Sequence, residues 1–193
     1  MASLKRDQLV DTALDLFTKQ GYRATGIDKI LSESGIAKMT LYNHFNSKDE
    51  LIIAVLGKRD ESFMSWLRES IPRFSPQQKC NPKLYKIMAF FDALDEWFNS
   101  DNFYGCNFIN ACVEFKRVDD PIHAAASAHK KLVIQMLQEL LAELHLENVH
   151  DVAKQIHMLV EGAIVMAVCL NDRTTAKIAK ETAQHLLSSY IEA

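Results

Sequence analysis

Residues 38–44, which we predict to form a short helix, carry side chains that are able to contact duplex nucleic acid. An ammonium, a hydroxyl, a phenol, an amide and an imidazole fall within seven consecutive positions. Helical spacing places Leu41 and Phe45 on one face, which we expect to be buried, and turns the polar face outward. Groups of these types hydrogen-bond to phosphate oxygens and to base edges. The alternative is a surface helix with incidental polar residues. The residues expected to face outward are Lys38, Met39, Thr40, Tyr42, Asn43 and His44.

A tight turn precedes this segment and joins it to another short helix. Apolar residues at helical spacing over residues 27–31 predict that helix, and Thr25 with Asp28 three residues later forms a weak version of a capping box at its start. Gly35 can adopt the left-handed conformation that ends a helix, and Ile36 can fill the angle between the two helices. Such a pair is a helix-turn-helix, and the major groove of DNA admits its second helix.

The remaining sequence predicts an all-α fold. Only 6 glycines and 4 prolines occur in 193 residues, so long stretches lack helix breakers. Gly21 marks the end of the first helix. Ser47 and Glu50 form a full capping box ahead of a long connecting helix, which we expect to end at the Ile71-Pro72 step. The other predicted helices span about residues 4–20, 83–99, 107–117, 120–146, 150–170 and 173–191.

Composition and charge limit the classes of protein to which the chain can belong. With 48% apolar and 24% charged residues, it is an ordinary well-packed chain. The net charge is −3, but residues 1–48 have an excess of two positive charges and residues 49–193 an excess of five negative charges. A DNA-facing surface is therefore expected early in the chain. The longest apolar run, residues 163–170, is far shorter than the roughly 20 residues that span a bilayer, so we expect no membrane segment.

The sequence lacks the common catalytic and metal-binding patterns. It has no GxSxG, Walker A, GxGxxG or HExxH motif, so we expect no enzyme. Its seven histidines lack the spacing of common metal sites, and we expect neither a metal nor a cofactor. The four cysteines form no CxxC pair, which indicates reduced thiols in a cytoplasmic protein. For Cys106 and Cys112, a redox switch is the alternative to small buried hydrophobic residues.

The N-terminal sequence resembles the DNA-binding domain of TetR-family regulators. Its core, Leu-Tyr-x-His-Phe-x-x-Lys over residues 41–48, is highly specific, and the resemblance covers about a quarter of the chain. It implies a DNA-binding domain over residues 1–50 and an effector-binding and dimerisation domain over residues 51–193. The residues that carry it are Gly21-Tyr22-Arg23-Ala24-Thr25, Ile27, Ile30, Gly35-Ile36-Ala37-Lys38, Thr40-Leu41-Tyr42-Asn43-His44-Phe45 and Ser47-Lys48-Asp49-Glu50-Leu51.

By this resemblance, Thr25, Tyr42 and Lys48 contact the DNA backbone. Helix N-termini attract phosphate, which suits the places of Thr25 and Lys48. His44 is either a groove contact or a packing and capping group. The chain departs from the family pattern at Ala37, where a capping Ser is common. It also departs at Met39, where a Gly is frequent, and the Met39 side chain can meet a thymine methyl. The candidates for contacts with base edges are Lys38, Met39, Thr40 and Asn43.

The last two predicted helices carry apolar stripes that include small residues. In TetR-like proteins the corresponding helices pair across a two-fold axis as a four-helix bundle, which implies a homodimer. The alternative is that these stripes fill the core of a single chain. The candidate interface residues are Ile156, Val160, Ala163, Ala167, Ala179, Ala183, Leu186, Leu187 and Tyr190.

The resemblance also implies a cavity for a small, largely apolar effector, between the DNA-binding region and the dimer helices. Aromatic residues are frequent there, although most of them suit a core equally well. Residues 105–111 are similar to a segment in a subset of the family, in which Asn107 and Asn110 are either structural caps or ligand-orienting groups. The candidate ligand-binding residues are Phe63, Trp66, Phe91, Trp97, Tyr104, Phe108, Asn110, Cys112 and Met136.

Together, these features predict a repressor that binds a palindromic operator in double-stranded DNA and is released by its effector. Two reading helices must match half-sites about 34 Å apart, so a ligand that changes their spacing lowers DNA affinity. The alternative is a ligand- or protein-binding helical module that has lost DNA binding, with Cys106 and Cys112 as a redox sensor.

Overall fold

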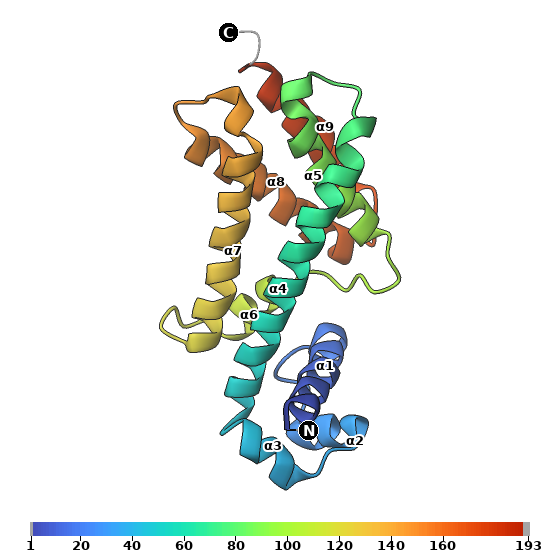
Figure 1. Cartoon of the computed structure of the whole chain (residues 1–193), viewed down its shortest axis with the longest axis vertical. Helices are drawn as coiled ribbons and strands as arrows, with labels where there is room; N and C mark the ends of the chain where they lie inside the picture. Colours follow the sequence, from blue (N-terminus) through green and yellow to red (C-terminus); the bar gives the residue numbers. More distant parts are fainter. Residues whose placement is uncertain (1, 191–193) are drawn as a thin grey trace. The chain divides into compact units, whose positions relative to one another are not determined.

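Helices make up the regular structure of this protein, for which a computed structural model describes residues 2–190 (Figure 1). Within that range there are nine α-helices, three short 3₁₀ helices and no strand, which confirms the all-α fold. The helices are α1 (Ala2–Gln20), α2 (Ile27–Ser34), α3 (Lys38–His44), α4 (Lys48–Phe74), η1 (Ser75–Gln77), η2 (Pro82–Leu84), α5 (Tyr85–Phe98), α6 (Asn107–Glu114), α7 (Pro121–Leu140), η3 (Ala142–Leu144), α8 (Val149–Cys169) and α9 (Thr175–Ser188).

The described residues divide into two compact units. The first unit contains the chain up to Ser62 together with Cys106–Lys130, and the second contains Phe63–Gly105 together with the chain from Lys131 onward. Helices α4 and α7 each supply residues to both units. The boundary predicted after residue 50 separates DNA binding from effector binding and dimerisation, and it stays a prediction.

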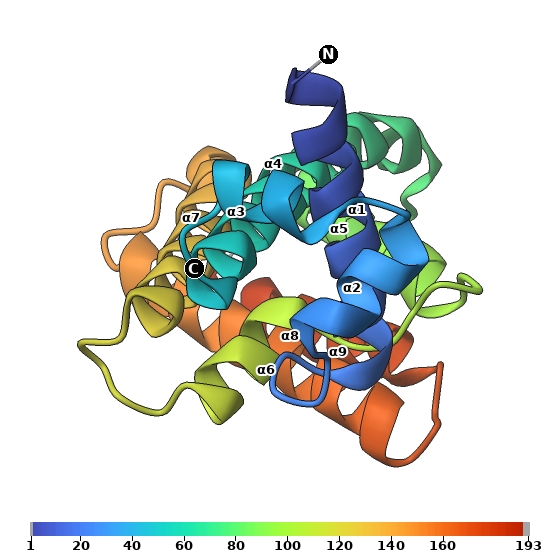
Figure 2. The same ribbon diagram turned by 90° about the horizontal axis from the view of Figure 1, so that it is seen from below.

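Helices α1, α2 and α3 form the helix-turn-helix head of the first unit and can be followed in Figure 2. Gly21 ends α1 with a φ of 86°, and Gly35 ends α2 with a φ of 66° while its N–H donates to the Leu31 carbonyl. Both values lie in the left-handed region that favours glycine. The predicted ends of α1 and α2, and the predicted bounds of α3, are confirmed.

The start of α2 differs from the prediction. Gly26 is its N-cap residue and no side chain caps the helix, so the capping box predicted for Thr25 and Asp28 is wrong. The Thr25 hydroxyl instead donates to the Gly21 carbonyl at 2.8 Å. This bond closes the turn between α1 and α2, and it takes the side chain away from the helix that it was expected to cap.

The long helix α4 begins where predicted but ends later. The Ser47 hydroxyl accepts the Glu50 N–H at 3.2 Å, whereas the Glu50 carboxylate accepts the N–H of Asn46 rather than that of Ser47. Helix α4 then continues through Pro72 to Phe74. Pro72 has no N–H to donate to the carbonyl of residue 68, and the helix ends two residues later.

In the C-terminal half, the predicted helices are present with shorter ends. The helix predicted over residues 107–117 ends at Glu114, and the one predicted over 120–146 is divided into α7 and η3. Asp120 caps α7 by accepting the Ile122 N–H at 2.8 Å. Helix α9 ends at Ser188, and residue 191, the predicted end, lies outside the described residues.

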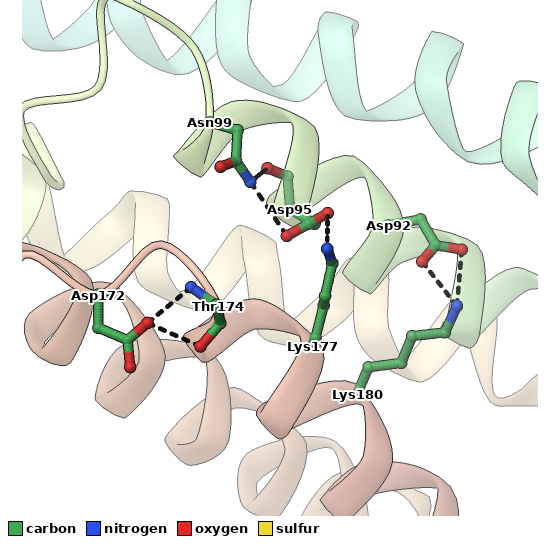
Figure 3. A network of polar contacts seen from close by, with 7 residues as sticks. All are labelled: Asp92, Asp95, Asn99, Asp172, Thr174, Lys177 and Lys180. Atoms are coloured by element: carbon green, nitrogen blue, oxygen red, sulfur yellow. Dashed lines mark hydrogen bonds and ion pairs between the residues drawn. The ribbon is translucent and has the colours of Figure 1, made fainter.

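Helices α5, α8 and α9 pack together in the second unit, with Phe90, Phe91 and Phe98 in its core. Two lysines of α9 reach toward aspartates of α5, as Figure 3 shows.

Helix α8 is the one described helix that is long and apolar enough to span a membrane. The sequence predicted no such helix, because the longest apolar run is only residues 163–170. Core helices of soluble proteins meet the same criteria, and α8 buries seven residues here. The expectation of no membrane segment stays a prediction.

Candidate nucleic-acid interface

Helix α3 has one buried face and one open face, as its sequence predicts. Leu41 is fully buried and Phe45, directly after the helix, is 3% exposed. The Arg6 guanidinium lies 5.3 Å from the Phe45 ring centre and covers that ring. Of the residues expected to face outward, Lys38, Met39, Tyr42 and Asn43 are exposed, and Thr40 and His44 are half-buried. The open face of α3 therefore offers a varied set of polar groups together with one thioether.

The turn before α3 fixes its position in the head. Ile36 is 8% exposed and its N–H donates to the Ser34 hydroxyl at 3.3 Å. Gln8 of α1 donates to the Ser34 carbonyl at 2.9 Å, so α1 holds the end of α2. Ala37 is the N-cap of α3 without a side-chain hydrogen bond, and its carbonyl accepts the N–H of Thr40 at 2.9 Å and that of Leu41 at 3.3 Å.

The two lysines at the edges of this surface lie in different surroundings. Lys38 is exposed and pairs with Asp28 at 3.7 Å, a surface ion pair that is easily exchanged for another anion. Lys48, the first residue of α4, is half-buried, with its Nζ 6.0 Å from the Phe17 ring centre. Burial lowers the pKa of Lys48, while the Glu114 and Asp49 carboxylates oppose that change.

The structure places Thr25 differently from the role that its family resemblance implies. Thr25 is fully buried, and its hydroxyl is engaged by the Gly21 carbonyl. This placement argues against a direct phosphate contact by its side chain and gives Thr25 a part in holding the turn. The ring centres of His44 and Phe45 are 6.4 Å apart. Both alternatives for His44, packing and groove contact, therefore stay open.

Sequence reasoning missed α6 as part of the surroundings of the head. The hydroxyl of the fully buried Tyr22 donates to the Asn107 carbonyl at 3.1 Å, and the Asn107 amide donates to the Thr18 hydroxyl at 2.7 Å. Burial raises the pKa of Tyr22 above its ordinary value. Asn107 thus has a structural role, one of the two alternatives given for it. No local signal could reveal these bonds, since the partners lie more than 80 residues apart.

The candidate effector residues do not gather around one cavity. A cavity of about 580 Å³ lies in the second unit, and Met136 is the only candidate among its lining residues. Phe63 packs on both Trp66 and Trp97, with ring centres 5.4 and 5.0 Å apart. Phe91 is fully buried and Tyr104 is exposed. The remaining candidates, on α6 in the first unit, are Phe108, Asn110 and Cys112.

Most candidate dimer residues are instead buried within the single chain. Seven of the nine have exposed fractions between 0% and 6%, because the stripes of α8 and α9 face other parts of their own unit. Leu186 and Tyr190 are half-buried. The burial of these seven residues favours the alternative, in which these stripes fill the core of a single chain, and the predicted interface stays a prediction. The seven are Ile156, Val160, Ala163, Ala167, Ala179, Ala183 and Leu187.

None of the four cysteines forms a disulfide bond within the described residues. Cys106 is buried at the N-cap of α6, and its Sγ accepts a hydrogen bond from Lys130 Nζ at 3.3 Å. Cys112 lies six residues further along, which corresponds to about 9 Å of helical rise and is too far for a disulfide without unwinding. Among the described residues, no group of three or more His, Cys, Asp or Glu side chains is arranged to hold a metal ion.

Comparison with known proteins agrees with this geometry. Residues 9–55 match the family described as bacterial regulatory proteins, tetR family. The chain is 34% identical to the transcriptional activator FasR of Mycolicibacterium smegmatis over 91 residues, which are 47% of this chain and less than half, 41%, of FasR. It is 23% identical to the transcriptional regulator YjdC of Escherichia coli K12, over 95% of this chain and 94% of YjdC.

The likeness extends to solved structures. A TetR-family transcriptional regulator from Streptomyces coelicolor superposes with a TM-score of 0.78 at 28% identity, covering 97% of this chain and 88% of the other. A helix-turn-helix with an open reading face, the matching N-terminal sequence and the whole-chain likeness all lead to one assignment. Residues 9–55 match the TetR family, and over its whole length the chain is similar to TetR-family transcriptional regulators, which are not enzymes.

Proposed function

We propose that the protein is a cytoplasmic repressor that binds a palindromic operator as a homodimer and leaves it when a small, largely apolar ligand binds. The observation that carries this proposal is the open face of α3. Its reading side chains are exposed on a helix that Leu41 and Phe45 lock against the head. A rigid helix with an uncovered polar face is what the major groove requires.

Each side chain of this surface has a proposed role. Tyr42 and Lys48 bind phosphates on either side of the groove. The base contacts are made by Lys38, which suits guanine, Asn43, which suits adenine, and Met39, whose thioether suits a thymine methyl. Thr40, half-buried, reaches a base edge or a phosphate from the first turn of the helix.

The second copy packs on an apolar face of α8. Met158, Val165 and Met166 follow helical spacing, and their exposed fractions are 72%, 44% and 46%. Water-exposed apolar side chains in a row are unfavourable unless another surface covers them. A two-fold axis lets the same face of each copy cover the other. This surface replaces the buried stripes that the sequence suggested.

The effector occupies the cavity of the second unit. Its volume of about 580 Å³ falls within the roughly 300–1,000 Å³ of ligand pockets, and Ile71, Tyr85, Met136 and Leu140 give it apolar walls. Lys86 and Glu143 form an ion pair of 2.7 Å on the wall. Helices α4 and α7 line the cavity and also enter the first unit. A ligand that favours a different arrangement of these helices shifts the population away from the DNA-binding state.

Selection of bound fragments from randomised DNA tests the function and identifies the operator. Lys48→Ala and Tyr42→Phe should then each weaken binding to that operator, and Lys48→Ala should reduce the salt dependence of log Kd by about 0.9 for the lost phosphate contact. Lys131→Ala, which removes an exposed lysine of the second unit, is the control and should change neither. Selection without any sequence preference, or full affinity in both variants, would contradict the proposed docking.

A further inference from the structure

The turn between α1 and α2 is held by a carboxylate from a distant helix. Glu114, the last residue of α6, accepts the N–H of Tyr22 at 2.9 Å through Oε1 and the N–H of Arg23 at 2.7 Å through Oε2. The partners lie about 90 residues apart in the chain, yet all belong to the first unit. In Figure 2, α6 lies next to this turn. One side chain therefore satisfies two backbone donors directly after α1.

Further contacts from the same helix surround this carboxylate. Arg23 Nε donates to the Glu114 backbone carbonyl at 3.1 Å, and its guanidinium lies 5.4 Å from the Phe115 ring centre. The Tyr22 ring packs edge-on against Phe115, while its hydroxyl bonds to Asn107 at the other end of α6. Tyr22 is thus held by α6 through both its backbone and its phenol.

The backbone of the turn is shaped for this anion. Gly21 has a φ of 86°, and a Cβ at that position would lie 3.0 Å from Glu114 Oε1. Successive N–H groups after a left-handed residue form a concave site for an anion. Hydrogen bonds to a carboxylate are about twice as strong as neutral ones. The turn and Glu114 therefore fit each other in both shape and charge.

The consequence for the head follows from what comes after the turn. Thr25, bonded to the Gly21 carbonyl, leads directly into α2, and α2 leads through Gly35 into the reading helix α3. The negative charge of Glu114 also favours the charged form of Lys48, the residue proposed to contact phosphate, and so raises its pKa against the effect of burial. The direction in which α2 leaves α1 is thereby set from α6.

We propose that Glu114 is a positioning residue for DNA binding, which holds the α1–α2 turn so that α2 and α3 are presented correctly to the groove. The proposal rests on the proposed docking of α3. Removing the Glu114 carboxylate has two opposite effects on DNA affinity, and the direction of the measured change shows which is larger. Near Arg23 and Lys48, loss of a negative charge should by itself strengthen attraction to DNA. Loss of the positioning bonds should weaken binding instead.

The experiment compares Glu114→Ala and Glu114→Gln with Glu61→Ala, which removes an equal charge from an exposed position of the same unit. Operator Kd is measured over a range of salt, and hydrogen exchange follows the amides of Tyr22 and Arg23. Glu114→Ala should bind on the order of tenfold more weakly, a size typical of coupling between sites. Its salt slope should not change, since no phosphate contact is lost, and both amides should exchange faster. Glu114→Gln, whose oxygen still accepts one N–H, should lose less.

The outcomes separate this proposal from the proposed function. Equal or tighter binding by Glu114→Ala, or the same change in Glu61→Ala, overturns the positioning role. If Glu114→Ala proves unfolded by circular dichroism, Glu114→Gln decides: weaker binding with faster amide exchange supports the role, and unchanged binding overturns it. A wild-type protein that binds no DNA sequence selectively contradicts the function itself.

Discussion

Replacing Lys180 by Met tests which of two neighbouring ion pairs holds α9 on α5 (Figure 3). Lys180 Nζ lies 2.6 and 2.7 Å from the two Asp92 oxygens and 2.9 Å from Gln78 Oε1. The exposed fractions of the Lys180 and Asp92 side chains are 23% and 28%. The pair of Lys177 and Asp95 is longer, at 3.5 Å, and Lys177 is 64% exposed.

The size of the effect follows from this difference in exposure. Lys180→Met keeps most of the aliphatic chain but leaves the Asp92 carboxylate partly buried, with Gln78 Nε2 still donating to it. A hydrogen bond to a charged group contributes about 1.5–3 kcal/mol to stability. Because both side chains are about a quarter exposed, solvent screening makes this pair weaker than a fully buried one. We expect a loss of about 2 kcal/mol in unfolding free energy. The exposed pair should contribute at most about 0.5 kcal/mol, so Lys177→Met is the matched control.

Urea unfolding near neutral pH measures both values, at one fixed protein concentration because dimerisation would shift the midpoint. A double-mutant cycle with Asp92→Asn isolates the interaction of Lys180 with Asp92, and we expect a coupling energy above about 1 kcal/mol. Equal costs for Lys180→Met and Lys177→Met would refute the reasoning, because burial would then not decide the strength of these pairs.

Two further predictions concern alkaline stability and assembly. Burial raises the pKa of Tyr22 above its ordinary 10.0, so the unfolded chain loses this proton first as the pH rises past 10, and the unfolding free energy should fall there. In urea titrations, Tyr22→Phe should make this fall with pH less steep. An unchanged slope would be contrary evidence. Met158→Lys should convert the dimer to monomer in sedimentation, whereas Leu132→Lys, at an exposed apolar site on α7, should leave it intact; a Met158→Lys dimer would speak against the α8 face.

Local signals explain why the head could be predicted so closely. Gly21 and Gly35 end their helices for a conformational reason that each glycine carries by itself. The spacing of Leu41 and Phe45 fixes which face of α3 is buried, whatever covers it. The capping role predicted for Thr25 was wrong because its hydroxyl can hydrogen-bond either to the start of α2 or to the Gly21 carbonyl, and in the structure it donates to that carbonyl.

Apolar stripes were less informative because they indicate burial without identifying the covering surface. Ile156 and Ala183 are covered by their own chain, although the same pattern would suit a dimer interface. The exposed set on α8, with Met158 and Val165, keeps helical spacing but gives a weaker signal, because Glu161 and Gly162 occupy the turn between its members. The aromatic residues raised a similar difficulty: Trp97 and Phe63 fill space by packing on each other, so they do not line the cavity.

The first unit contains more of the chain than the DNA-binding motif, and the additional residues support that motif. The family match ends at residue 55, but the same unit includes Cys106–Lys130. There, His129 pairs with Asp60 of α4 at 2.5 Å and stacks on Phe108, with ring centres 3.6 Å apart. These contacts, in which His129 and Phe108 are buried, fix α6 against α4 and α7, so that α6 can hold the α1–α2 turn firmly. Substitutions in α6 should therefore change operator affinity without touching DNA, because the reading helix depends on contacts made outside the motif.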